Sequence, residues 1–359
     1  MKIRIPALLF SVVPVVAVAS GLELAAPRPA LSQQSLQVNP ALPAESRQFD
    51  FWVGEWDVNL RVRQDDISWK DSQDAVARIY PILKGKALLE LWDEQRIKGF
   101  SVRYFDTERQ RWVLWLNWPG MNRSGSSKLV GEFRHGRGEF YSAKARPDGV
   151  QAVSRYTFSD ITPTSLRWDD AYSADGGKTW SSSWIMEFSR TGALPVLPPV
   201  GGTVPTFDGG ERCTDEEFRR YEFLEGERAG GVESHGDEWS TLGAASLTGY
   251  RILDGCSVIV FMRWGQGGSG EELFAQITWN TIAGRFELLT LDSDPETPAR
   301  VFYTEEDAED LLFVELLDGS PGQNRVHILS GTDGFVGWVH ETRRGDGWWE
   351  TWRARFGGE

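Results

Sequence analysis

The sequence predicts an all-β protein made of two tandem antiparallel up-and-down β-barrels joined by a Pro/Gly-rich linker. Three observations support this fold class: a motif that occurs twice about 170 residues apart, short strand-like segments throughout each copy, and a proline- and glycine-rich stretch between the copies. A repeat this long, present only twice, indicates a duplicated domain, because solenoid repeats are roughly 20 to 50 residues long. Each half is therefore expected to fold as one module.

The repeat is clearest at the start of each copy. Residues 47–56 read RQFDFWVGEW and residues 219–228 read RRYEFLEGER, so arginine, phenylalanine, glycine and glutamate recur at the same spacing. Further matches follow in the same order: 82–85 with 252–255, Trp112 with Phe286, Trp168 with Trp338, and Trp184 with Trp352. Small drifts in spacing between these matches place the insertions in loops.

The first 32 residues have the layout of a secretory signal peptide. Lys2 and Arg4 precede an apolar stretch, and small residues follow it. The stretch is shorter than the ~20 residues that a membrane-spanning helix needs, so we expect no stable membrane insertion. The mature protein is expected in the periplasm or outside the cell.

The remaining chain divides by composition. Residues 33–45 are expected to be disordered, and residues 191–212, which are dense in proline and glycine, to form a linker. These boundaries leave barrel 1 at 46–190 and barrel 2 at 213–357.

Strands are predicted where β-branched and aromatic residues cluster between turn residues. In the first copy the predicted strands are 75–80, 87–92, 100–105, 112–118, 138–144, 150–158, 165–172 and 182–188. About eight to ten strands in consecutive order fit an up-and-down barrel, although a sandwich has a similar number of strands.

The opening motif favours the barrel. Gly54 and Trp56 supply a residue without Cβ, where the first strand curls across the closed end, and a flat side chain that closes the barrel. This Gly-x-Trp segment resembles the lipocalin-like (calycin) barrels, in particular a bacterial domain family of uncharacterised function, and the resemblance covers residues 46–190. The second copy departs from the pattern, since Arg228 replaces the tryptophan, so we expect a diverged partner domain.

Charge and cysteine usage limit the function classes. The formal net charge is −14, which argues against nucleic acid and anionic lipid as partners, because both favour a basic surface. The only two cysteines, Cys213 and Cys256, are a disulfide candidate in an oxidising compartment. Two unrelated buried thiols are the alternative.

Tryptophan-rich strands suggest a ligand cavity in barrel 1. Broad rings line pockets for flat apolar molecules, and they equally pack the barrels and the contact expected between them within the chain. The candidate ligand-binding residues are Trp92, Trp112, Trp115, Trp168, Asp170, Tyr172 and Trp184. The repeat aligns Asp170 with His340, and both are expected to face the lumen unless the strand register turns them toward solvent.

No metal or nucleophile motif is present. The four histidines lack a second ligand at close spacing, so no cofactor is predicted. A haem held by His340 rests on a resemblance to nitrobindin-like barrels at that single residue. Carboxylates such as Glu90 and Asp93 are expected at the surface, at strand ends.

Two functions follow from a barrel with a cavity. The preferred hypothesis is an exported protein that binds a small apolar or amphipathic ligand. The alternative is a calycin-type isomerase, cyclase or hydratase acting in the same cavity, with Asp170 or His340 as proton donor; this rests on fold analogy alone.

Overall fold

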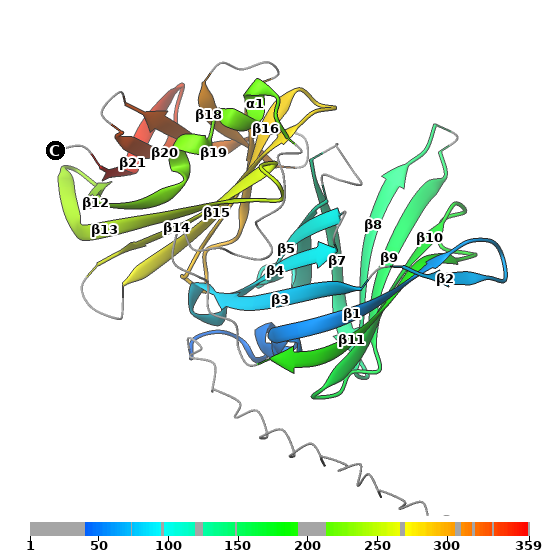
Figure 1. Cartoon of the computed structure of the whole chain (residues 1–359). Helices are drawn as coiled ribbons and strands as arrows, with labels where there is room; N and C mark the ends of the chain where they lie inside the picture. The colour runs from blue at the N-terminus through cyan, green and yellow to red at the C-terminus, as the bar shows by residue number, and fades with distance from the viewer. Residues whose placement is uncertain are drawn as a thin grey trace, which may run out of the picture. The chain divides into compact units, whose positions relative to one another are not determined.

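The chain folds into two closed antiparallel barrels of ten strands each, as a computed structural model shows (Figure 1). The structure describes residues 40–357 except 73, 95–96, 119–124, 148, 193–212, 266–269, 306–309, 318–319 and 332–333. The predicted signal peptide, residues 33–39 of the predicted disordered segment and residues 193–212 of the predicted linker lie outside the described residues. The predicted all-β fold with two tandem barrels is confirmed.

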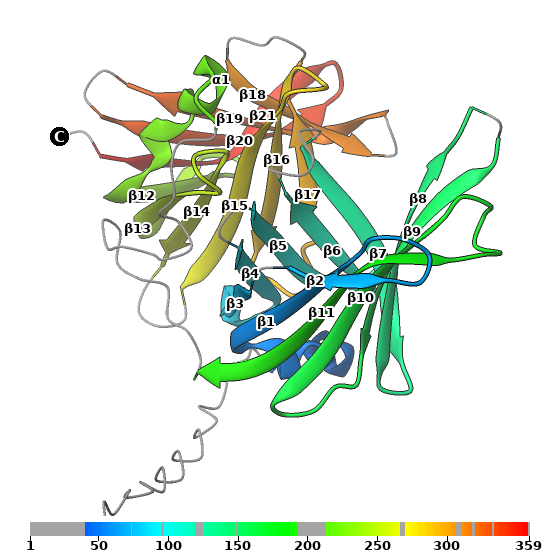
Figure 2. The same ribbon diagram turned by 45° about the vertical axis from the view of Figure 1, so that its right-hand side comes forward.

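Barrel 1 is closed by β1, which pairs with both β3 and β11, while β2 extends the sheet beside β1. Its strands are β1 (Gly54–Arg63), β2 (Trp69–Asp71), β3 (Ala75–Ile82), β4 (Ala87–Glu94), β5 (Ile97–Asp106), β6 (Arg111–Asn117), β7 (Ser126–Arg134), β8 (Arg137–Ala145), β9 (Gln151–Ser159), β10 (Ser165–Ser173) and β11 (Ser181–Gly192). Two 3-10 turns, η1 (Ala44–Arg47) and η2 (Asp50–Trp52), lie at the end of the barrel where β1 begins (Figure 2), and η3 (Leu83–Gly85) joins β3 to β4.

Barrel 2 is an uninterrupted meander in which β12 pairs with β21 to close the ring. Its strands are β12 (Gly226–His235), β13 (Trp239–Ile252), β14 (Ser257–Trp264), β15 (Glu271–Asn280), β16 (Arg285–Asp292), β17 (Arg300–Tyr303), β18 (Leu311–Leu317), β19 (Ser320–Ser330), β20 (Val336–Arg344) and β21 (Gly347–Phe356). A short helix, α1 (Glu216–Arg219), and a 3-10 turn, η4 (Glu222–Leu224), precede it.

Two strands of barrel 1 were not predicted. β7 reads SSKLVGEFR, in which polar residues and a glycine outnumber β-branched residues, so propensity does not reveal it. β2 is short and exposed on all three residues. Pairing with β6 and β8 rather than local preference holds β7 in place.

The two barrels repeat the same backbone irregularities, as expected of a duplication. Leu83, Lys84 and Gly85 have positive φ, and so do their matches Leu253, Asp254 and Gly255. Gly54 and Gly226, which open the two barrels, have φ values of 140° and 110°. Because non-glycine residues rarely adopt positive φ, its recurrence at matched positions identifies a domain duplication.

The closed end of barrel 1 is sealed by rings. Phe49 is fully buried and contacts Trp112 edge to face, with ring centroids 4.8 Å apart. Trp56 is also fully buried, and the guanidinium of Arg190 lies 4.0 Å from its ring. A Cβ on Gly54 would lie 2.2 Å from that guanidinium and would displace it, and the φ of 140° independently favours glycine there.

Barrel 2 retains an aromatic residue at the position of Phe49 but has no tryptophan at the position of Trp56. Tyr221 matches Phe49, is fully buried and contacts Phe286, the match of Trp112, edge to face. Its hydroxyl donates to the Cys256 carbonyl at 2.9 Å. Arg228, which replaces the tryptophan, bonds instead to the Glu225 carbonyl, so the indole is not replaced by another ring at that position.

Strand β4 contributes to two hydrophobic cores. Leu88 and Trp92 belong to the core inside barrel 1, whereas Leu89 and Leu91 belong to a second core that includes residues of barrel 2. Strand β6 alternates in the same way, with Leu114 inside and Trp115 in the shared core. Because neighbouring side chains of a strand point to opposite faces, strands buried on both sides read as continuous apolar runs.

The shared core joins matching faces of the two barrels within the compact unit of residues 33–359. Phe100 stacks on Phe274, with centroids 6.4 Å apart and ring planes at 11°. Both residues hold the same place in their barrels, since Phe100 pairs across the sheet with Leu91 and Phe274 pairs with Phe261. The Trp115 indole donates to Gln276, and Lys98 pairs with Asp254 at 2.9 Å. Contact between equivalent residues is the pattern of an isologous interface.

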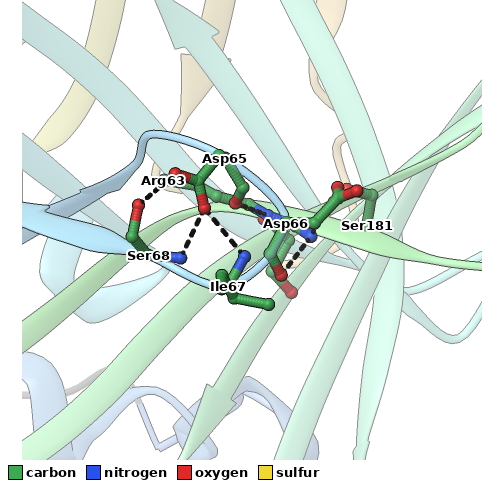
Figure 3. A network of polar contacts seen from close by, with 7 residues as sticks. Arg63, Asp65, Asp66, Ile67, Ser68 and Ser181 are labelled. Atoms are coloured by element: carbon green, nitrogen blue, oxygen red, sulfur yellow. Dashed lines mark hydrogen bonds and ion pairs between the residues drawn. The ribbon is translucent and has the colours of Figure 1, made fainter.

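Two local links fasten the remaining segments. Cys213 and Cys256 form a disulfide that ties the segment before α1 to the turn before β14. At the β1–β2 turn, Arg63 donates to the Asp65 carbonyl, to Asp66 and to Ser181 on β11 (Figure 3). The Asp65 carboxylate accepts from Ser68 and from the backbone of Ile67, and these hydrogen bonds lower its pKa.

Candidate functional site

A cavity of about 160 Å³ lies in the lumen of barrel 1, and rings and apolar chains supply most of its lining. It is lined by Trp52, Glu90, Arg103, Leu116, Trp118, Ser127, Tyr156, Phe158, Trp168, Asp170, Trp184, Met186 and Phe188. Trp168 contacts Tyr156 on one side and Trp184 on the other, with centroids 4.7 and 6.0 Å away. These flat walls suit a flat apolar guest.

A buried ion pair borders this cavity. Arg103 donates to the Glu90 carboxylate at 3.1 Å, and both side chains are 4% exposed. Ser101 donates to the same carboxylate oxygen at 2.6 Å, and the Arg103 guanidinium lies 3.3 Å from the Trp52 ring. Burial raises the pKa of Glu90, which Arg103 opposes, and burial lowers the pKa of Arg103 to about 9. Such a pair costs desolvation energy that its own attraction does not reliably recover.

Tyr156 and Asp170 face each other across the β9–β10 pair. Burial raises the pKa of Tyr156 to about 12, and the negative charges of Asp170 and Glu90 add to that shift. Among the described residues, no hydrogen bond reaches the Tyr156 hydroxyl. A tyrosine in this setting stays protonated at neutral pH and keeps an unused donor at the cavity.

A β-bulge sets the position of Asp170. The register between β10 and β11 shifts there, so Ser183 is the extra residue between Ser182 and Trp184. Its hydroxyl donates to the Asp170 carboxylate at 2.9 Å, and its backbone N–H donates at 3.3 Å. Burial nevertheless raises the pKa of Asp170. Bulges of this kind aim side chains at functional sites in many β-proteins.

Barrel 2 repeats the bulge with different chemistry. The shift lies between His340 and Glu341, the extra residue is Thr351, and its hydroxyl lies 2.8 Å from His340 Nδ1. His340 stacks on Trp352, the match of Trp184. Burial lowers the pKa of His340 to about 4, an effect that Arg300 adds to and that Glu315 and Glu341 oppose.

The polar cluster of barrel 1 has no counterpart in barrel 2. Strand pairing fixes the matching positions, because Glu90 pairs with Ser101 where Val260 pairs with Ala275, and Leu88 pairs with Arg103 where Val258 pairs with Ile277. Likewise Asp170 pairs with Tyr156 where His340 pairs with Val326. Glu90, Ser101, Arg103 and Tyr156 are thus matched by Val260, Ala275, Ile277 and Val326. The fold itself does not require the polar cluster.

The cavity in barrel 2 is also smaller, at about 60 Å³. Arg300 lies there at the position that Ser127 occupies in barrel 1, since Thr290 pairs with Arg300 as Leu116 pairs with Ser127. Among the described residues, no three His, Cys, Asp or Glu side chains form a group that could hold a metal ion.

The structure brings three of the seven predicted ligand residues to the cavity: Trp168, Asp170 and Trp184. Trp92 is fully buried and contacts the rings of Trp118 and Trp184 rather than lining the cavity. Trp112 lies at the closed end, where its indole donates to the Gln48 side chain at 3.1 Å.

Trp115 and Tyr172 lie elsewhere. Trp115 is on the outer face of β6, in the core shared with barrel 2, because its odd spacing from Trp112 puts the two indoles on opposite faces. Tyr172 is 47% exposed near the end of β10. The Trp115 correction follows from strand parity. Tyr172 has the same parity as Trp168 and Asp170, but it lies past the register shift between Asp170 and Ala171, where the alternation of buried and exposed residues reverses.

Sequence reasoning missed Glu90, Arg103 and Tyr156. Glu90 was expected at the surface, but it lies inside the barrel because β4 is buried on both faces. The sequence around it, Leu-Leu-Glu-Leu-Trp, is an apolar run interrupted by one carboxylate, and that interruption was the available signal. A charged residue within a strand buried on both sides needs a partner and points to a functional site.

Comparison with known proteins adds little. No protein-family model matches the chain, and no curated protein matches it. One solved structure that it is similar to is a protein of unknown function from the DUF3598 family of Nostoc punctiforme, with 9% identity and a TM-score of 0.23 over 88% of this chain and 98% of that one. Similarity of this size does not support an inference about function. None of the described helices is both long and apolar enough to cross a bilayer.

Replacing Arg103 alone should be far more damaging than replacing the pair. We expect Arg103→Ile to lower the free energy of unfolding by about 3–5 kcal/mol, because the Glu90 carboxylate stays buried without its cation. The double variant Glu90→Val/Arg103→Ile, which copies barrel 2, should recover most of that loss. Guanidinium unfolding curves measure both; a double variant as unstable as the single one would show that the fold needs the pair.

Acid should weaken the fold through His340. Its pKa is 6.5 when unperturbed and about 4 in the fold, so the unfolded chain binds the proton more readily between these values. The stabilisation from neutral His340 is complete above pH 6.5 and is lost as the pH falls through 4, by about 3 kcal/mol in all. The difference in unfolding free energy between wild type and His340→Gln should shrink over this range; a constant difference contradicts the prediction.

Proposed function

We propose that this protein is an exported binding protein that holds a small apolar or amphipathic molecule in the cavity of barrel 1. The observation that carries the proposal is the cluster of the buried Glu90 and Arg103 with the half-buried Tyr156 at that cavity. Barrel 2 shows that the same fold accommodates apolar side chains at the matching positions. A chain that keeps a costly polar cluster at one cavity only has a use for it there.

We also propose that barrel 1 is a lipocalin-like barrel. Gly54 and Trp56 close the barrel at its start, and Arg190 from the last strand lies over the indole and donates to the carbonyls of Phe51 and Val53. Export to the periplasm or the outside fits the disulfide between Cys213 and Cys256, because such bonds persist in oxidising compartments. The net charge of −14 favours neither nucleic acid nor an anionic membrane as partner.

Cavity size limits the guest. A cavity of about 150 Å³ is enough for benzene, so the cavity of about 160 Å³ suits a molecule built around a single ring. Affinity would come from apolar burial, at about 25 cal/mol per Å² removed from water, less the cost of immobilising the guest. In this proposal barrel 2 supports barrel 1 through the shared core rather than binding the same ligand.

The alternative is an enzyme using the same cavity. The observation in its favour is that Tyr156 and Asp170, a hydroxyl with a free donor and a carboxyl with a raised pKa, face each other at the cavity. In such an arrangement the phenol can donate to a carbonyl oxygen on which negative charge develops. We rank it second because among the described residues no separate general base stands free at the cavity, Glu90 being paired with Arg103.

Filling the cavity should abolish binding. We expect Ser127→Phe to weaken binding of toluene at least tenfold, because the added ring occupies the space between Leu116 and the opposite wall. The control is Ala143→Phe, which adds the same ring at an exposed position of the same barrel. Titration calorimetry measures both variants. Equal loss in the two variants, or none in Ser127→Phe, would place the binding site elsewhere.

The variant Asp170→Asn distinguishes the binding hypothesis from the enzyme hypothesis. With a panel of single-ring terpenoids analysed by gas chromatography, we expect bound ligand and no product from either the wild type or Asp170→Asn. Product formed by the wild type and lost in Asp170→Asn, at unchanged ligand affinity, would establish the enzyme instead.

A further inference from the structure

Tyr156 gives the cavity a phenolic donor that no described residue uses, in addition to unpaired N–H groups of Trp52, Trp184 and Arg103 whose atoms are fully covered. Its ring is fixed against Trp168, 4.7 Å away, and its hydroxyl has no hydrogen-bond partner among the described residues. Since the pKa of this hydroxyl is raised to about 12, it donates a hydrogen bond at neutral pH rather than carrying a charge. A guest that brings an acceptor to this hydroxyl gains a bond that an apolar guest cannot make.

The charges around the cavity oppose an ionic guest. Among the described lining residues the one cation, Arg103, is already paired with Glu90 at 3.1 Å, while Asp170 adds a second carboxyl. Among these residues an anion would therefore meet two acidic groups and a cation that already has an acidic partner. A cation would have only Asp170, whose carboxylate already accepts two hydrogen bonds from Ser183 and whose charged form is disfavoured by burial.

The walls set the shape of the guest. Trp168 and Trp184 meet nearly at right angles, at 85°, and Phe158 and Trp52 lie deeper toward the closed end. Flat rings make offset or edge contacts with such walls, and the volume of about 160 Å³ admits one ring with a short substituent.

We propose that the cavity of barrel 1 selects an uncharged single-ring compound with a carbonyl group, whose oxygen accepts a hydrogen bond from Tyr156. This assignment rests on the proposed binding function and adds the chemical class of the ligand to it.

Four probes of nearly equal size test the assignment in the full-length mature protein: ethylbenzene, acetophenone, benzoate and benzylammonium. Ethylbenzene lacks a hydrogen-bond acceptor, and acetophenone offers a carbonyl oxygen. Benzoate carries a negative charge and benzylammonium a positive charge. Titration calorimetry at pH 7 should show acetophenone binding about tenfold more tightly than ethylbenzene, because its oxygen accepts a hydrogen bond from Tyr156, with both ions weaker than either.

Tyr156→Phe removes only the hydroxyl. In this variant acetophenone should lose its advantage while ethylbenzene keeps its affinity. The matched control is Tyr141→Phe, the same change at an exposed tyrosine whose hydroxyl bonds to Glu139 outside the cavity, and it should bind like the wild type. The infrared C=O stretch of bound acetophenone should lie at lower wavenumber in the wild type than in Tyr156→Phe, which reports the hydrogen bond directly.

The outcomes distinguish the two proposals. Equal affinity for ethylbenzene and acetophenone, tighter binding of either ion, or an advantage of acetophenone that persists in Tyr156→Phe would overturn the carbonyl assignment and leave the binding function standing. Failure of all four probes to bind would overturn both.

Discussion

Closure of each sheet into a ring is the constraint from which the rest of the structure follows. A strand alternates its side chains between two faces, so in a closed barrel half of them must fill the lumen and half must meet either water or a neighbour. In barrel 1 the lumen is filled by rings and still leaves about 160 Å³. On β4 and β6 the outer half meets barrel 2, so these strands are buried on both sides.

Sequence patterns were sufficient to predict the duplication, the strand-rich modules and the closed end at Gly54 and Trp56, because each depends on local composition or on comparing the chain with itself. The site was predicted only in part. Trp115 and Trp112 were assigned together to a cavity although their spacing puts them on opposite faces. Glu90 and Tyr156 were missed because their roles depend on strands that pair across the sheet, which propensity does not report.

The two copies have diverged where the site lies and remained alike where the fold is made. Both keep the left-handed turn before β4 and β14, and both keep the bulge that places a hydroxyl against a titratable side chain. Between the copies, however, Asp170 is matched by His340, and Glu90, Arg103 and Tyr156 by aliphatic residues. Barrel 2 is therefore an internal control for what the architecture alone demands, and the polar cluster of barrel 1 is additional to that requirement.

The stacking of Phe100 on Phe274 joins matching residues of the two copies. Side chains that meet their own duplicates lie near the axis of a twofold-symmetric pair. The covalent link between the two copies makes their association independent of concentration, unlike that of two separate subunits. Two covalently linked copies are also free to diverge from each other in sequence.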